Sequence, residues 1–231
     1  MLPLTPKEVS LGSFSTAACE ATGTVVIIDV FRAFTTAAIA LANGASRIIM
    51  ADSLEMAMDL RRQNVGRYCL GERGGVRPEG FDFGNSPVDI LNRRFDGDTL
   101  IQTTSNGTRG ILAAKSAKRI YAASLVTAAA TAEAVRRAAD RPVTLVAMGD
   151  LDRFRTDEDE ICALYLRSLL FGLTPDAAAV AHAIRTMSRH TDGRRMSAAD
   201  VDCCLDINRI PFAVRVNEQE GAWVAVAEPM S

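Results

Sequence analysis

Polar residues able to do chemistry follow a short apolar run near the N-terminus. Asp29 directly follows residues 24–28 (TVVII). Arg32, Thr35 and Thr36 come next, at a spacing that places them on one face of a helix. A carboxylate at the end of a buried strand, beside a helix start rich in donors, suits a site for a metal ion and a phosphate. Capping of the helix by Asp29 is the simpler interpretation, but a cap requires neither Arg32 nor both threonines.

A second group of candidates lies in the glycine-rich segment 71–87 (GERGGVRPEGFDFGNSP), which has no helix or strand periodicity. Long loops in compact domains are usually functional or disordered. The acids Glu72 and Asp82 could bind a cation while Arg73 binds an anion, and the glycines let the backbone approach a ligand. Oxygen ligands without histidine favour magnesium over zinc. A solvated loop held by exposed ion pairs is the alternative.

A third group follows the apolar run at residues 99–103. The free backbone amides at a helix N-terminus form a natural anion site, and one helix cap needs only one of the polar residues present here. We therefore predict anion binding at this helix start. The residues concerned are Thr104, Ser105, Asn106, Gly107, Thr108 and Arg109.

Four consecutive acids at residues 157–160 open a later helix. Acids in a first turn interact favourably with the helix dipole without any further function, and this interpretation is the better supported one. Glu158 or Asp159 could nevertheless complete a magnesium shell.

Two known phosphatase patterns do not fit the sequence well. Residues 203–209 (CCLDINR) have the Cys-x5-Arg spacing of cysteine phosphatases, but they contain no glycine and Asp206 would repel the substrate. Asp29 lacks the second aspartate of the Asp-x-Asp phosphatases, so the sequence does not imply an aspartyl-phosphate intermediate.

Short apolar runs alternate with helical segments along the chain. Such alternation predicts an α/β fold with a mostly parallel sheet and helices on both faces. Residues 1–231 are predicted to form one domain, with a helical part from about residue 150 onward. Within it, Pro175 should open a helix, and a hairpin should turn near residues 217–221. The strands are expected at residues 24–29, 47–51, 67–70, 99–103, 119–122 and 143–148.

The composition is that of an ordinary globular protein. A formal net charge of -2 provides no electrostatic basis for binding nucleic acid or an anionic membrane. No apolar run is long enough to cross a bilayer, and the 5 cysteines show no CxxC spacing, which favours a reducing compartment. A cytoplasmic protein is expected. Apolar helix surfaces could also serve a homo-oligomer.

With these motifs in view, the chain resembles the 2-phosphosulfolactate phosphatases of coenzyme M biosynthesis. The similarity is clear over about the first 125 residues and continues weakly through Glu158-Asp159, Cys162, Ser188 and Gly193-Arg194. After Val143 the family's glycine- and threonine-rich turn is replaced by residues 148–152 (MGDLD). The matching motifs are residues 28–36, 40–45, 71–75, 79–82, 84–87, 103–104 and 106–109.

The resemblance implies a family-specific α/β fold, dependence on Mg²⁺, and hydrolysis of a phosphate monoester of a small sulfonated or carboxylated acid. From the resemblance, the site would include Asp29, Arg32, Thr36, Glu72, Arg73, Asp82, Asn85, Asn106 and Arg109. The local motifs described above add the other residues to the expected site. The expected catalytic residues are Asp29, Arg32, Glu72, Arg73, Asp82, Asn106 and Arg109. The expected substrate-binding residues are Thr35, Thr36, Gly74, Gly75, Asn85, Ser86, Thr104, Ser105, Gly107 and Thr108. The expected metal ligands are Asp29, Glu72 and Asp82, with Glu158 or Asp159.

Two alternatives stay open at this point. One is a phospho-ligand-binding protein of the same fold without catalysis. The other is a nucleotide-binding enzyme, which is less well supported because neither GxGxxG nor GxxxxGK[ST] follows any predicted strand.

Overall fold

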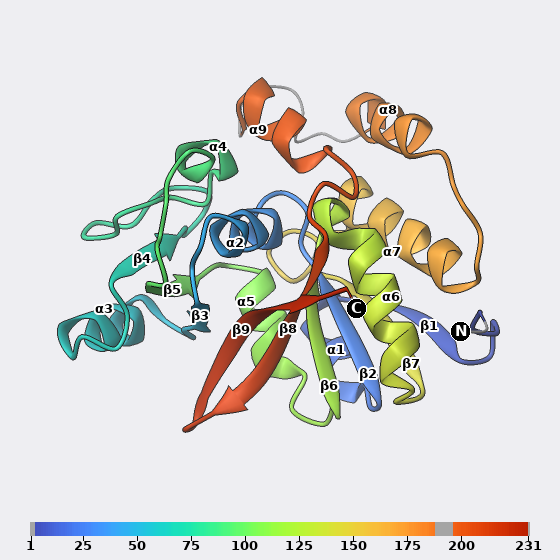
Figure 1. The fold of residues 1–231 in the computed structure, drawn as a ribbon, viewed down its shortest axis with the longest axis horizontal. Helices are drawn as coiled ribbons and strands as arrows, with labels where there is room; N and C mark the ends of the chain where they lie inside the picture. Colours follow the sequence, from blue (N-terminus) through green and yellow to red (C-terminus); the bar gives the residue numbers. More distant parts are fainter. Residues whose placement is uncertain (1–2, 188–195, 231) are drawn as a thin grey trace.

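The computed structural model describes residues 3–187 and 196–230. These residues form a nine-stranded sheet covered by helices on both faces, as the alternating sequence pattern predicts (Figure 1). Ser188, Gly193 and Arg194, which contribute to the family resemblance, lie outside the described residues. Among the described helices, none has the length and apolar character needed to cross a membrane.

The strands occur in the sheet in the order β1-β7-β2-β6-β8-β9-β3-β5-β4. Their bounds are β1 (Val9–Ser13), β2 (Thr24–Ile28), β3 (Arg47–Met50), β4 (Tyr68–Gly71), β5 (Thr99–Thr103), β6 (Arg119–Ala123), β7 (Val143–Ala147), β8 (Phe212–Gln219) and β9 (Ala222–Pro229). The helices are α1 (Phe14–Glu20), α2 (Ala33–Ala42), α3 (Leu54–Arg62), α4 (Pro87–Ile90), α5 (Gly107–Ala113), α6 (Ala128–Ala138), α7 (Asp157–Leu170), α8 (Ala177–Met187) and α9 (Ala198–Cys204), with a 3-10 turn η1 (Leu125–Thr127).

Both faces of β2 are buried, which explains the apolar run of residues 25–28. In β2, Val25 and Ile27 pack into the core shared with α1, α2 and α5, whereas Val26 and Ile28 pack into the core shared with α6 and α7. Successive side chains of a strand point to opposite faces, so a strand covered on both sides favours apolar residues at successive positions.

The sheet consists of two parallel groups joined by an antiparallel hairpin. Strands β1, β7, β2 and β6 form one group, and β3, β5 and β4 form the other. Hairpin β8–β9 pairs antiparallel with β6 on one side and with β3 on the other. Three successive antiparallel pairings separate β6 from β3. The strands of the second group are therefore antiparallel to those of the first. Sheet twist of about 20–25° per strand turns the second group across the first rather than leaving it opposed in one plane (Figure 1).

Most expected elements are present. The six strands expected in the first 150 residues and the C-terminal hairpin are confirmed, and Ser53 caps α3 by accepting a hydrogen bond from the Met56 amide. The prediction that Pro175 opens a helix is wrong, because α8 begins at Ala177 and the Asp176 carboxylate accepts from the amides of Ala178 and Ala179. Sequence periodicity did not predict β1, α1, α4 and α9, which have 4 to 7 residues each.

Candidate active site

A cavity of about 450 Å³ opens beyond the carboxyl ends of four strands. The loops that follow β2, β4, β5 and β7 supply most of its wall, which is where ligands bind in open α/β sheets. A cavity of this volume accommodates a small organic molecule. Its lining residues are Asp29, Phe31, Arg32, Glu72, Gly74, Gly75, Val76, Asn85, Ser105, Asn106, Asp150, Leu151 and Met196.

Asp29 lines the cavity directly after β2 and is only 6% exposed. Its Oδ1 accepts a hydrogen bond from the Ala33 amide at 3.0 Å, so the carboxylate also caps the start of α2. A carboxylate has about four acceptor positions, and this cap uses one of them. The capping and ligand-binding interpretations of Asp29 are therefore compatible.

The electrostatic surroundings of Asp29 oppose its charge. Burial is the main cause that raises the pKa of the Asp29 carboxyl to about 7, and the charges of Glu72 and Glu158 also raise this pKa. Hydrogen bonds from the backbone amides of Ala33 and Gly107 lower it only in part. A cation bound beside a buried acid that is surrounded by other acids lowers the pKa of that acid strongly, because it offsets both the burial and the neighbouring charges.

Glu72 connects two loops at the cavity wall. Its Oε1 accepts from the Ser105 amide at 2.7 Å, and its Oε2 accepts from the Gly75 amide at 2.7 Å and from Ser105 Oγ at 3.2 Å. The carboxylate thereby joins the glycine-rich loop after β4 to the loop after β5. Both loops and Glu72 itself line the cavity.

Two asparagines present unpartnered oxygens in the same region. The Oδ1 atoms of Asn85 and Asn106 are buried and have no hydrogen-bond partner among the described residues, and both residues line the cavity. Buried polar atoms are nearly always paired in folded proteins, so two such oxygens in one cavity indicate a ligand that interacts with oxygen.

The junction between β5 and α5 brings the helix close to Asp29. A Cβ on Gly107 would lie 2.8 Å from Asp29 Oδ2 and 3.0 Å from Phe34 Cζ, so only glycine fits there. Thr104 and Thr108 fix the junction, since the backbone amide of each donates to the hydroxyl of the other at 3.1 Å. These three residues do not line the cavity but shape the loop that carries Ser105 and Asn106.

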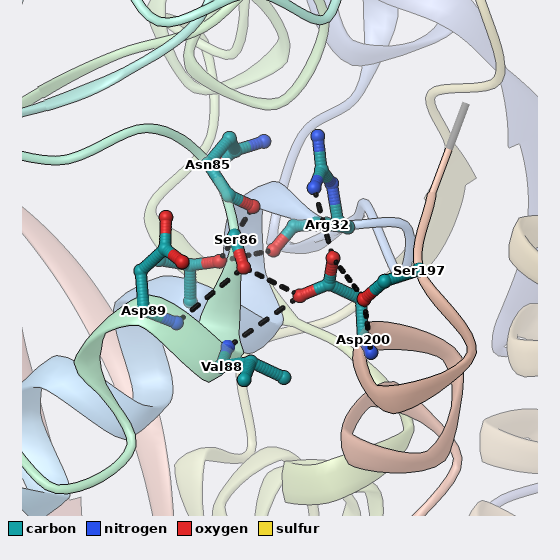
Figure 2. Close-up of polar contacts among 8 residues, drawn as sticks. Arg32, Asn85, Ser86, Val88, Asp89, Ser197 and Asp200 are labelled. Carbon is teal, nitrogen blue, oxygen red and sulfur yellow. Dashed lines mark hydrogen bonds and ion pairs between the residues drawn. The ribbon is translucent and has the colours of Figure 1, made fainter. Parts of the chain in front are cut away.

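Among the described residues that line the cavity, Arg32 is the one with a cationic side chain. One terminal nitrogen of its guanidinium lies 3.2 Å from Asp200 Oδ2 (Figure 2). Asp200 belongs to α9, almost 170 residues further along the chain. A surface arginine would not hold one orientation, and this ion pair gives Arg32 one.

Asp82, an expected metal ligand, does not line the cavity. Its two carboxylate oxygens accept from the terminal nitrogens of Arg61 at 2.8 and 3.1 Å, and Oδ2 also accepts from the Cys69 amide at 2.8 Å. Asp82 therefore fastens the glycine-rich loop to α3 and β4.

Two expected anion-binding arginines are also absent from the lining. Arg73 donates to the carbonyl oxygen of Glu72 at 2.8 Å and to Thr103 Oγ1 at 2.7 Å. Arg109 is 62% exposed, and its Nε lies 3.6 Å from Asp152 Oδ2. The first stabilises the end of β4 against β5, and the second pairs with the turn after β7.

The acids at the start of α7 lie behind the cavity. Asp159 accepts from the Val30 amide at 2.8 Å and from the Gly149 amide at 2.9 Å, which ties together the ends of β2 and β7. Burial and the nearby charges of Asp29 and Glu158 raise the pKa of Asp159 well above its usual range. Glu158 is buried, does not line the cavity, and acts on Asp29 through its charge.

The remaining expected residues bind backbone or protein side chains. Thr35 Oγ1 donates to the Val30 carbonyl at 2.9 Å, and Thr36 Oγ1 donates to the Asn85 carbonyl at 3.1 Å. Ser86 Oγ donates to Asp200 at 2.6 Å. None of these three hydroxyl residues lines the cavity, and among their partners Asn85 does.

Sequence reasoning did not identify the apolar part of the wall. Phe31, Val76, Leu151 and Met196 line the cavity, and Leu151 is 61% exposed and has a positive φ of 54°. Leu151 lies in the turn where the sequence departs from the family pattern, and that departure was the only signal for it. The exposed side chains of Val76 and Leu151 add apolar surface to the solvent side of the cavity wall.

The donor set fits a magnesium ion. Asp29 supplies a carboxylate, and Asn85 and Asn106 supply two unpartnered amide oxygens. Mg²⁺ is usually held by one or two carboxylates, with waters and substrate oxygens completing an octahedron. Within the described parts of the chain, no three His, Cys, Asp or Glu side chains form an all-protein metal site. The residues present thus suit an ion that keeps several waters.

The fold and the site together define an α/β protein with an acidic, oxygen-lined ligand cavity at the carboxyl ends of its strands. Residues 13–219 match the profile of the 2-phosphosulpholactate phosphatase family, and the chain belongs to this family. The match extends far beyond the first 125 residues, where the motifs are densest.

Curated relatives agree with this assignment. The chain is 34% identical over 215 residues to a probable 2-phosphosulfolactate phosphatase of Carboxydothermus hydrogenoformans, covering 87% of this chain and 89% of that protein. It is 38% identical over 176 residues to a protein of the same description from Symbiobacterium thermophilum, covering 73% of each. With the Caldicellulosiruptor saccharolyticus protein of that description, 37% identity extends over 155 residues, 65% of this chain and 64% of the relative.

Proposed function

We propose that this protein is a magnesium-dependent phosphatase that hydrolyses a phosphate monoester of a small anionic acid. The observation that carries the proposal is the meeting of Asp29 with the unpartnered oxygens of Asn85 and Asn106 in one cavity, with Arg32 in the same wall. Acidic oxygens suit a cation, and a guanidinium suits a phosphate. Family membership supports the same class of reaction.

Hydrolysis of a phosphate monoester joins a water oxygen to phosphorus while the bond from phosphorus to the ester oxygen breaks and the alcohol leaves with a proton. The transition state is loose, so positioning and charge neutralisation dominate catalysis. Arg32 would hold the phosphoryl oxygens through the guanidinium nitrogens that do not contact Asp200. A magnesium ion held by Asp29, Asn85 and Asn106, with Glu72 next to them, would polarise the phosphoryl group and acidify an attacking water.

The substrate we propose is 2-phosphosulfolactate or a related phospho-acid. The relatives' names support 2-phosphosulfolactate. The changed turn with Leu151, at the mouth of the cavity, is the feature by which this chain could prefer a different acid.

Asp29→Asn tests the proposal. We expect the variant to fold and to lose phosphate release by about a thousandfold or more, because the neutral amide cannot hold a divalent cation as a carboxylate does. The measurement is inorganic phosphate release from a panel of small phospho-acids, with magnesium and with a chelator. Asp52→Asn is the matched control, since Asp52 is exposed and outside the cavity.

Two results would speak against the proposal. Turnover by Asp29→Asn at the rate of the native protein would remove Asp29 from the reaction. Tight binding of a phospho-acid without any phosphate release by the native protein would indicate a non-catalytic phospho-ligand-binding protein of the same fold.

A further inference from the structure

Asp200 is a buried carboxylate that lies between two parts of the cavity wall. The residue is 4% exposed, and it is on α9, which none of the site motifs includes. Its oxygens accept four hydrogen bonds, from Arg32 at 3.2 Å, Ser86 Oγ at 2.6 Å, Ser197 Oγ at 2.9 Å and the Val88 amide at 3.5 Å. Figure 2 shows Arg32 on one side of the carboxylate and Ser86 and Val88 on the other.

The contact with Arg32 uses only part of the guanidinium. One terminal nitrogen faces Asp200 Oδ2, and the opposite end of the group points away from α9 (Figure 2). The Arg32 side chain is 14% exposed and lines the cavity. A carboxylate that binds one edge of an arginine fixes the plane of the group and leaves its other donors for a planar or tetrahedral anion.

The other oxygen of Asp200 acts on Asn85. Oδ1 accepts from Ser86, the residue next to Asn85, and Ser86 also accepts from the Asp89 amide at the start of α4. Thr36 Oγ1 donates to the Asn85 carbonyl at 3.1 Å. Asp200 thus fixes the backbone that carries the unpartnered amide oxygen of Asn85.

We propose that Asp200 is a positioning residue, which orients Arg32 toward the phosphoryl group and holds the Asn85 loop at the cavity. The proposal rests on the proposed phosphatase function. A purely structural role, in which Asp200 only fastens α9 to α4, is the alternative. The two differ in whether the effect of Asp200 on phosphate binding depends on Arg32.

Asp200→Asn is the first variant. An asparagine keeps the size of the side chain and can still accept from Ser86, but it removes the charge opposite Arg32. We expect the KM for the phosphoester to rise by roughly tenfold or more, with a smaller fall in kcat, because a loosened Arg32 binds ground state and transition state less well to a similar extent. Asp202→Asn is the matched control on the same helix, as Asp202 pairs with Arg185 at 2.7 Å and is 66% exposed.

A double-mutant cycle with Arg32→Ala separates positioning from structure. If Asp200 acts through Arg32, Asp200→Asn causes little further rise in KM in the Arg32→Ala background. The same fold-rise in both backgrounds would overturn the proposal. Asp200→Glu, which keeps the charge, should recover part of the lost affinity, and it takes the place of Asp200→Asn in the cycle if that variant does not fold.

Calorimetric binding of inorganic phosphate in the presence of magnesium gives a readout that does not need turnover. If no ester is hydrolysed, the proposed function fails, while the same cycle run on phosphate affinity still tests Asp200. Weaker phosphate binding by Asp200→Asn that disappears in the Arg32→Ala background supports the inference. Equal binding by the native protein and Asp200→Asn, or no binding by either, contradicts it.

Discussion

At the scale of single residues, the site gathers buried acidic groups whose charged forms are disfavoured before any ligand binds. Asp29 has a pKa of about 7, and Asp159 behind it also has a raised pKa, because both are buried and close to other acids. Active sites commonly contain such costly groups, since the same environment that disfavours an isolated charge favours a bound counter-ion. Asp82, by contrast, forms an ion pair with Arg61 and stabilises the glycine-rich loop after β4.

The raised pKa of Asp29 predicts how stability depends on pH in the metal-free protein. Its pKa is about 7 in the folded state against an ordinary value of 3.8, so the folded state holds a proton more tightly than the unfolded chain. The stability contributed by this proton is present at low pH and is lost as the pH rises toward 7. At higher pH the buried charge costs up to about 4 kcal/mol.

The melting temperature of Asp29→Asn minus that of the native protein should therefore be larger at pH 8 than at pH 5. We expect this difference between variant and native protein to increase by roughly 5 °C from pH 5 to pH 8, measured without metal. Added magnesium should raise the melting temperature of the native protein and leave that of the variant unchanged. A difference that does not vary with pH would show that the Asp29 charge is not destabilising.

At the scale of elements, the site depends on short junctions between strands and helices. The loop after β4 is fixed by Glu72 and Asp82, the loop after β5 by the paired Thr104 and Thr108, and the end of β2 by Asp159. Several residues that were expected to contact a ligand thus stabilise the loops on which the lining residues lie. Their polar character was visible in the sequence, but their partners were not.

Gly107→Ala tests the close approach of α5 to Asp29. The added Cβ would meet Asp29 Oδ2 at 2.8 Å, so the carboxylate or the helix must move. We expect phosphate release to fall roughly tenfold or more, with a stability loss of about 1–3 kcal/mol. Gly84→Ala is the control, because its Cβ would meet the Cβ of Arg77 at an ordinary 3.6 Å. Full activity of Gly107→Ala would show that Asp29 need not hold this position.

At the scale of the whole molecule, hairpin β8–β9 connects the two parallel groups of strands. One hydrophobic core extends over both groups, since it contains Ile27 of β2, Val214 of β8 and Ile48 of β3. A shared core of this kind predicts that the two groups unfold together.

The single tryptophan allows a test of this cooperativity. Trp223 lies in β9 opposite Met50 of β3 and Glu218 of β8, at the junction of the two groups. We expect urea unfolding curves from tryptophan fluorescence and from far-ultraviolet circular dichroism to coincide. Separate transitions would show that the two groups are independent units and would contradict the prediction of one domain.

The sequence by itself determined the central elements and the chemical character of the site. Buried strands such as β2 are recognisable because both faces require apolar residues, and Asp29, Glu72 and Asn106 stand out because polar residues directly follow such strands. Short elements such as α9 were missed because 7 residues give too little periodicity.

Only the tertiary structure decided which polar residues share the cavity. The pairing pattern runs β4 and β5 opposite to β2, and the twist through the hairpin is what brings Glu72 and Asn106 to Asp29. Pairing between distant segments, such as Arg32 with Asp200, depends on how helices pack on the sheet. The local sequence determines the helix or strand propensity of each segment. The sheet twist and helix packing that bring distant segments together depend on the whole chain.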